Sequence, residues 1–199
     1  MSRLLSYLQI NGILLCNANP YLPALEDIGC SWNDMTELID SHQLFYCKAF
    51  RKRTTYLSAE VYYLLKVVRT PKKMSENAKT IYRMLDGKPP GDTKFLKEAA
   101  GLPAKDFQAG FDFLLQNLYI TALENGKQLH ETWSSFYYGT AGQWEQYAPD
   151  VYDASNARER LREILSRTMQ EKDIKWLIKQ EEPWMDRKRK KDACTAVKK

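Results

Sequence analysis

The stretch AKDFQAGFDFLLQNLYITALENGKQLHETW, residues 104–133, decides the fold predicted for this chain. Its first half repeats apolar residues at helical spacing, which predicts a helix with one buried face. These apolar residues are Phe107, Phe111, Leu114, Leu115 and Leu118. Its second half places Asn125-Gly126 between residues 119–124 and 127–133. Asn-Gly is a strong hairpin signal because both positions tolerate positive φ, so a β-hairpin is predicted to follow the helix.

More helices are predicted upstream of this stretch. Ser58 is a suitable N-cap for a helix that Pro71 stops, and Ser75 caps another helix. After the turn-rich segment GKPPGD, residues 87–92, a short helix runs to Gly101. Three helices followed by a hairpin is the winged-helix order, so residues 58–140 are predicted to form a winged helix-turn-helix unit. A general α+β domain is the alternative.

The flanking segments complete the predicted fold class, which is α+β and mainly helical. Residues 1–57 are predicted to form an additional N-terminal α/β segment, with a helix over 32–41 and strands over 43–50 and 53–57. Residues 141–185 are predicted to supply C-terminal helices, over 156–169 and 172–180. Residues 186–199 form a basic tail that we expect to be disordered. The linkers are short, so one compact body is expected.

Composition indicates an ordinary globular protein. With 199 residues and 44% apolar content, the chain is long enough to bury a core without disulfides or metals. The apolar run near Ile13 is too short for a membrane span and does not resemble a signal peptide, so a cytoplasmic protein without a membrane partner is expected. The four cysteines form no CxxC pair, which argues against zinc and favours buried free thiols. No cofactor is implied.

The net charge of +5 is unevenly distributed. Residues 186–199 carry seven Lys/Arg against two Asp, which accounts for the whole excess. Within the body, residues 42–83 carry ten basic residues against two acids, whereas residues 1–41 carry one Arg against five acids. One face of a balanced protein is therefore expected to be positive.

Basic residues in and near this segment are the candidate DNA contacts, and their clustering suits phosphates better than base edges. An ordinary solvated face is the alternative interpretation. The third helix of the predicted unit adds a few polar residues but also presents acids, which argues against reading of base sequence. The candidate DNA-binding residues are Arg51, Lys52, Arg53, Lys66, Arg69, Lys72, Lys73, Lys105, Gln108 and Lys127.

The N-terminal sequence resembles a known family. The segments YLQINGILLCNANPYLPALEDI, residues 7–28, and WNDMTELIDSHQLFYCKAFRKRTTYLS, residues 32–58, are similar to the AlkZ and YcaQ winged-helix DNA glycosylases. By size, the chain is similar to the smaller AlkZ-related proteins. This resemblance implies double-stranded DNA as the partner.

The resemblance also implies a catalytic pair. Family members hold a water at the anomeric carbon with a Gln-apolar-Asp or Gln-apolar-Gln pair, and the matching residues here are Gln9 and Asn11. An asparagine can orient a water but cannot accept its proton as a carboxylate would. The alternative is that both residues are merely polar positions at the entrance to a strand.

Three functions follow as hypotheses. The first is a DNA-binding winged-helix protein without catalysis, and the second is a DNA N-glycosylase that acts on alkylated or crosslinked bases. The third is a protein-interaction module on a winged-helix scaffold. An aromatic cluster at residues 133–147 is interpreted as core, although it could also stack an unpaired base.

Overall fold

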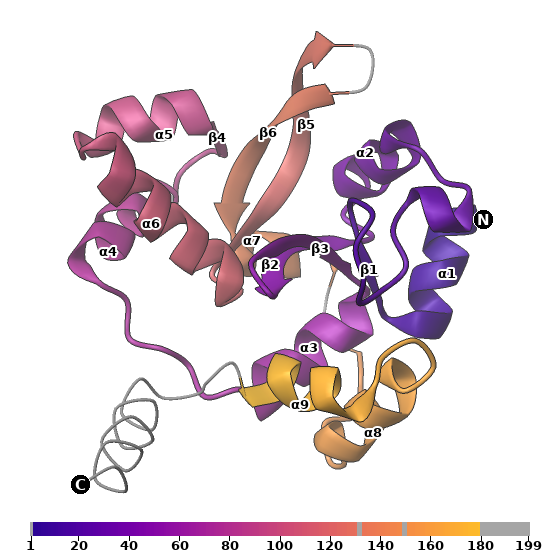
Figure 1. The fold of residues 1–199 in the computed structure, drawn as a ribbon. Helices are drawn as coiled ribbons and strands as arrows, with labels where there is room; N and C mark the ends of the chain where they lie inside the picture. The colour runs from indigo at the N-terminus through magenta and orange to yellow at the C-terminus, as the bar shows by residue number, and fades with distance from the viewer. Residues whose placement is uncertain (1, 131–132, 149–150, 180–199) are drawn as a thin grey trace, which may run out of the picture.

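The computed structural model describes residues 2–130, 133–148 and 151–179, so the predicted basic tail lies outside the described residues. Helices there surround two antiparallel sheets of three strands each (Figure 1). The elements are α1 (Arg3–Asn11), β1 (Ile13–Leu15), the 3-10 helix η1 (Glu26–Ile28), α2 (Trp32–Asp40), β2 (Phe45–Phe50), β3 (Arg53–Leu57), α3 (Ala59–Val68), α4 (Glu76–Arg83), β4 (Gly91–Asp92), α5 (Thr93–Ala100), α6 (Ala104–Gln116), β5 (Ile120–His130), β6 (Trp133–Thr140), α7 (Ala141–Glu145), α8 (Ala157–Leu165) and α9 (Glu171–Lys179).

The predicted α+β class is confirmed, as are the helices and strands expected in the flanking segments. Ser31, Ser58 and Ser75 each cap a helix by accepting a backbone N–H three residues ahead. These capping bonds satisfy donors that a helix cannot satisfy internally. Local capping and helical periodicity therefore explain why most of the helices are found where they were predicted.

The first sheet has the strand order β1-β3-β2 and is packed on both faces. Along β3, Tyr56 faces one core cluster and Leu57 faces the other, because successive side chains of a strand point to opposite faces. The turn between β2 and β3 is Arg51-Lys52, and both residues have positive φ, at 50° and 59°. This backbone is typical of two-residue hairpin turns but uncommon for residues other than glycine.

The second sheet has the order β4-β6-β5, and its β5–β6 hairpin projects from the body (Figure 1). The predicted hairpin is present, but its predicted turn at Asn125-Gly126 is wrong. Asn125 lies within β5, opposite Phe136, and the pairing shifts register between Asn125 and Gln128. A Cβ atom on Gly126 would lie 2.6 Å from the Ser135 Oγ, so glycine permits a close strand approach. The connection between β5 and β6 lies outside the described residues.

Two hydrophobic clusters divide the molecule. One contains buried residues of α1, α2, α4, α5 and α6 together with β5 and β6, and the other contains those of α3, α7, α8 and α9. The predicted inner face of the 104–118 helix is confirmed, since Phe107, Phe111, Leu114 and Leu115 are all buried. The predicted 58–140 unit thus contributes α3 to one cluster and α4, α5 and α6 to the other. In Figure 1, α4, α5 and α6 lie at the left of the view, and α3, α8 and α9 lie at the bottom.

The cysteines and the apolar character of the helices were both subjects of predictions from composition. Cys30 and Cys47 are buried free thiols as predicted, and Cys16 is half-buried. Burial raises the pKa of the Cys47 thiol to about 12, which keeps it protonated and unreactive. Among the helices of the described residues, none combines the length and apolar character needed to span a bilayer.

Candidate nucleic-acid interface

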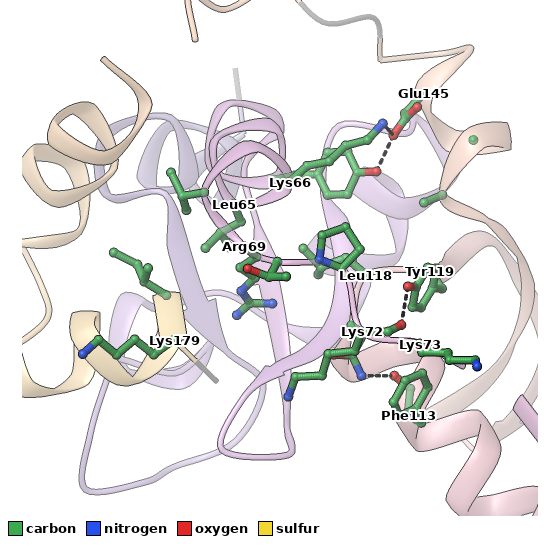
Figure 2. A pocket seen from close by; sticks show the side chains of 18 of the residues that line it. Leu65, Lys66, Arg69, Lys72, Lys73, Phe113, Leu118, Tyr119, Glu145 and Lys179 are labelled. Carbon is green, nitrogen blue, oxygen red and sulfur yellow. Dashed lines mark hydrogen bonds and ion pairs between the residues drawn. The ribbon is translucent and has the colours of Figure 1, made fainter. Parts of the chain in front are cut away.

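A groove of about 920 Å³ lies where the C-terminal ends of α3, α6 and α9 meet α7 (Figure 2). We call it the basic groove because six Lys/Arg residues line it and Glu145 is the single acid among its lining residues. The basic residues are Lys66, Arg69, Lys72, Lys73, Arg158 and Lys179. This excess of positive charge in a concave site attracts polyanions.

The chain between α3 and α4 forms one edge of the basic groove. α3 ends at Val68 and Arg69 is its C-cap with extended backbone, so the following residues run along the rim. The Tyr119 hydroxyl donates a 2.7 Å hydrogen bond to the Lys72 carbonyl oxygen. This bond ties the rim to the start of β5 and leaves the Lys73 side chain exposed.

Arg69 is less exposed than Lys73 and bonds to α9, which lines one side of the basic groove. Its Nη2 and Nε atoms donate to the Leu177 carbonyl oxygen at 2.7 and 3.0 Å, in the last turn of α9. A cation is favourable there because the last carbonyls of a helix lack internal partners. Burial lowers the pKa of Arg69 to about 10, so the guanidinium remains charged at neutral pH. Its contacts position α9, and its charge lies beneath the groove.

Glu145 on α7 is the acidic member of the basic groove. Its Oε1 atom accepts a 2.6 Å hydrogen bond from Lys66 Nζ and another from the Tyr62 hydroxyl. Burial, followed by the hydrogen bond to Glu145, raises the pKa of Tyr62, which therefore stays a hydrogen-bond donor. Glu145 therefore compensates part of the Lys66 charge.

Aromatic rings line the same groove. The Phe113 and Tyr119 rings are nearly parallel, with an interplanar angle of 16° and centroids 6.2 Å apart. Tyr82 meets Tyr119 edge-on at 6.3 Å. All three side chains are half-buried, so part of each ring surface faces solvent. Such rings offer planar apolar surface beside the cationic side chains.

Four predicted DNA contacts, Lys66, Arg69, Lys72 and Lys73, thus line one groove, but the five others whose side chains the structure describes do not. Arg51, Lys52 and Arg53 lie at the turn and start of the β2–β3 hairpin. Lys105 and Gln108 are exposed near the beginning of α6. Lys127 is in β5, and its side chain lies outside the described residues.

Arg51 makes contacts within the protein that its sequence position did not indicate. Its Nη2 atom pairs with Asp173 Oδ1 at 2.8 Å, and its guanidinium lies 4.4 Å from the centre of the Tyr21 ring. The Asp173 side chain is only 4% exposed, whereas that of Arg51 is 31% exposed. Arg51 therefore anchors α9 to the first sheet.

We expect Asp173→Ala to lower the free energy of unfolding by about 2 kcal/mol. Removing one partner of a buried ion pair costs roughly 3 to 5 kcal/mol, and we reduce this value because Arg51 retains contact with water. Urea denaturation measures the change. Glu171→Ala, at an exposed position on the same helix, is the matched control with an expected loss under about 0.5 kcal/mol. Equal losses for the two variants would contradict the anchoring role.

Gln9 and Asn11 lie in the last turn of α1, before β1. Residues two apart on a helix point about 200° apart around its axis, so the two side chains do not face one site. Gln9 is exposed, and Asn11 Nδ2 donates to the Tyr7 carbonyl oxygen at 3.1 Å. Neither residue lines the basic groove. The structure does not bring them together in a cleft.

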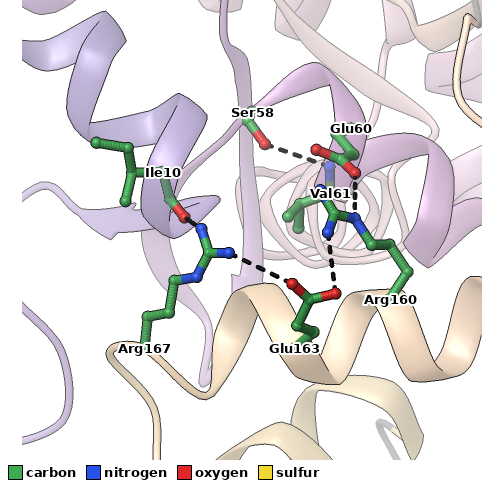
Figure 3. A network of polar contacts seen from close by, with 7 residues as sticks. All are labelled: Ile10, Ser58, Glu60, Val61, Arg160, Glu163 and Arg167. Carbon is green, nitrogen blue, oxygen red and sulfur yellow. Dashed lines mark hydrogen bonds and ion pairs between the residues drawn. The ribbon is translucent and has the colours of Figure 1, made fainter.

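The backbone between these two residues is bound to the turn that follows α8. Arg167 donates to the Ile10 carbonyl oxygen, and Figure 3 shows the polar network in which this contact takes part. In the same network, Arg160 bonds to Glu60 at 2.8 Å and to Glu163 at 2.9 Å. These contacts hold the end of α1 and the start of α3 against α8. They give the segment a structural role.

The aromatic cluster of residues 133–147 supplies core residues, as interpreted from sequence. Phe136, Tyr138 and Trp144 are buried, while Tyr147 is 65% exposed and stacks on His42. The Trp133 side chain lies outside the described residues. No group of His, Cys, Asp or Glu within the described ranges is arranged to hold a metal ion.

Comparison with known proteins gives one match. The model of a family described as AlkZ related matches residues 25–181 of this chain. No curated protein and no solved structure matches it. The matched region contains every residue of the basic groove and begins after Gln9 and Asn11. The match therefore adds no support for a catalytic role of those two residues.

Proposed function

Because this chain belongs to the AlkZ-related family, we propose that it binds DNA through the basic groove. The observation that carries the proposal is the convergence of six Lys/Arg side chains on one groove with a single carboxylate. Such residues bind phosphates and release the counterions around them, which gives affinity without reading base sequence. Binding is thus expected to be sequence-independent and sensitive to salt.

We further propose that the chain contains a winged-helix unit, which supplies the aromatic side of this groove while the basic residues come from the segments around it. Its support is the order of α4, α5, α6 and the β5–β6 hairpin, with β4 pairing to β6. The unit then begins at α4 rather than at Ser58, since α3 packs against α8. Lys105 and Gln108, near the start of α6, are separated by the acidic Asp106, so base reading by α6 is not proposed. The other end of α6 contributes to the basic groove.

The proposal covers binding and leaves base excision as a hypothesis to be tested separately. Gln9 and Asn11 point away from each other, and Arg167 binds the carbonyl between them. Incubation of the protein with alkylated duplex DNA, followed by measurement of released base, tests excision. Release that Gln9→Ala abolishes, with the fold retained, would establish the N-glycosylase and add an activity to the binding proposed here.

Fluorescence anisotropy of labelled DNA tests the binding proposal. A duplex and one of its separated strands are titrated with protein between 50 and 200 mM salt. For four phosphate contacts, the slope of log K against log salt is expected to be roughly −3 to −4. No binding of either form at the lowest salt would reject the proposal and favour the protein-interaction module.

A further inference from the structure

We propose that the basic groove holds a single strand of nucleic acid, with phosphates near Lys72 and Lys73 and bases on the adjacent aromatic rings. This inference rests on the proposed DNA binding and specifies which form of DNA enters the groove. It distinguishes single strands from duplexes and does not distinguish DNA from RNA, because a sugar-phosphate chain with unpaired bases occurs in both.

The size of the basic groove favours one strand. Its volume is about 920 Å³. Pockets of 300 to 1,000 Å³ hold drug-sized molecules, and a nucleotide is of that size. One or a few nucleotides of a single strand therefore fit, whereas a turn of double helix is many times larger and can contact only the rim.

The lining of the basic groove matches the chemistry of an unpaired strand. Proteins that bind single strands without sequence preference combine a positive groove with aromatic rings on which bases stack. Here Lys72 and Lys73 lie on the rim segment whose backbone is bonded to Tyr119, and Tyr119 packs beside Phe113 (Figure 2). One hydrogen bond thus holds the backbone of the rim that carries the lysines against an aromatic side chain. A duplex would leave the rings without a partner because its bases are already stacked.

Glu145 determines along which side of the basic groove the phosphates of the strand lie. Its carboxylate lies beside Lys66 and repels a phosphate there, whereas the rim near Lys72 and Lys73 offers cations. The backbone is therefore expected to follow the rim. Glu145→Gln keeps the side-chain shape and removes the repulsion, so this variant is expected to bind a single strand about threefold to tenfold more tightly.

The test compares labelled oligonucleotides of equal length in anisotropy titrations: single-stranded thymidine DNA, single-stranded uridine RNA and a blunt DNA duplex. We expect both single strands to bind at least tenfold more tightly than the duplex at the same salt. RNA and DNA of equal affinity support the proposal, since the groove would then bind any unpaired strand.

Two variant pairs locate the contact. Phe113→Leu removes a ring from the basic groove and is expected to weaken single-strand binding fivefold or more. Phe95→Leu removes a 56% exposed ring on α5, outside the groove, and is expected to have no effect. In the same way, a double variant in the groove is compared with a double variant on α5. The groove variant carries Lys72→Ala and Lys73→Ala, and the control carries Lys94→Ala and Lys97→Ala. Circular dichroism confirms that each variant is folded.

A duplex that binds as tightly as the single strands, with Phe113→Leu unchanged, overturns the single-strand proposal and leaves DNA binding intact. An absence of binding by all three probes overturns both proposals.

Discussion

Trp144→Ala is expected to lower the free energy of unfolding by about 4 kcal/mol. Trp144 is fully buried, and its ring lies 5.1 Å from both the Phe45 and Tyr62 rings. Its indole N–H donates a 3.1 Å hydrogen bond to the Leu44 carbonyl oxygen. The change leaves a cavity and removes the donor of a buried carbonyl, and Trp→Ala substitutions in cores cost roughly 3 to 5 kcal/mol.

Chemical denaturation monitored by circular dichroism measures this loss. Tyr147→Ala provides the control, because Tyr147 is three residues further along the chain but 65% exposed. We expect this control to lose less than about 1 kcal/mol. Trp144 precedes Glu145, so its packing also fixes the acidic member of the basic groove. A loss under about 1 kcal/mol for Trp144→Ala would show that α7 is not held in this way.

Phe111→Ala is expected to lower the free energy of unfolding by about 3 to 5 kcal/mol. Phe111 is 4% exposed and packs edge-on against Tyr138, with the ring centroids 4.9 Å apart. It also contacts Phe107 one helical turn earlier, at 5.6 Å. The substitution therefore removes the contact that joins α6 to β6.

The same denaturation experiment applies, with Phe95→Ala as control. Phe95 is 56% exposed, so little apolar surface is lost and the expected change is below about 1 kcal/mol. If Phe111→Ala proves as mild as this control, α6 is not packed on the second sheet. The position of Phe113 in the basic groove would then lose its support.

The sequence predicts most elements of the fold because their signals are local. Capping serines and helical periodicity locate α2, α3, α4 and α6 without knowledge of the tertiary structure. The Asn125-Gly126 turn was wrong because cross-strand pairing extends β5 to His130 and accommodates these residues as a register shift. Long-range pairing decides register in a hairpin, and it overrides a turn preference of two residues.

The basic groove could be predicted only in part. Charge density between residues 42 and 83 identifies Lys66, Lys72 and Lys73, but Arg158 and Lys179 reach the groove through the packing of α8 and α9. No sequence spacing connects these helices to α3. The same packing brings Arg51 and Arg69, two of the predicted phosphate contacts, against Asp173 and the Leu177 carbonyl oxygen, which no sequence pattern indicates.

If nucleic acid binds in the basic groove, the lysines of the groove determine how strongly binding depends on salt. The probe is a DNA duplex with a single-stranded overhang, which offers both strand forms. Wild-type protein is compared with a variant carrying Lys66→Ala, Lys72→Ala and Lys73→Ala, and with a control carrying Lys94→Ala, Lys97→Ala and Lys172→Ala at exposed positions outside the groove.

The groove variant is expected to reduce the slope of log K against log salt by about 1.4 to 1.8, because the two lost phosphate contacts of Lys72 and Lys73 account for 0.7 to 0.9 each, while Lys66 is already paired with Glu145. The control variant should retain a slope close to that of the wild type. A groove variant with the slope and affinity of the wild type would contradict binding of nucleic acid in the basic groove.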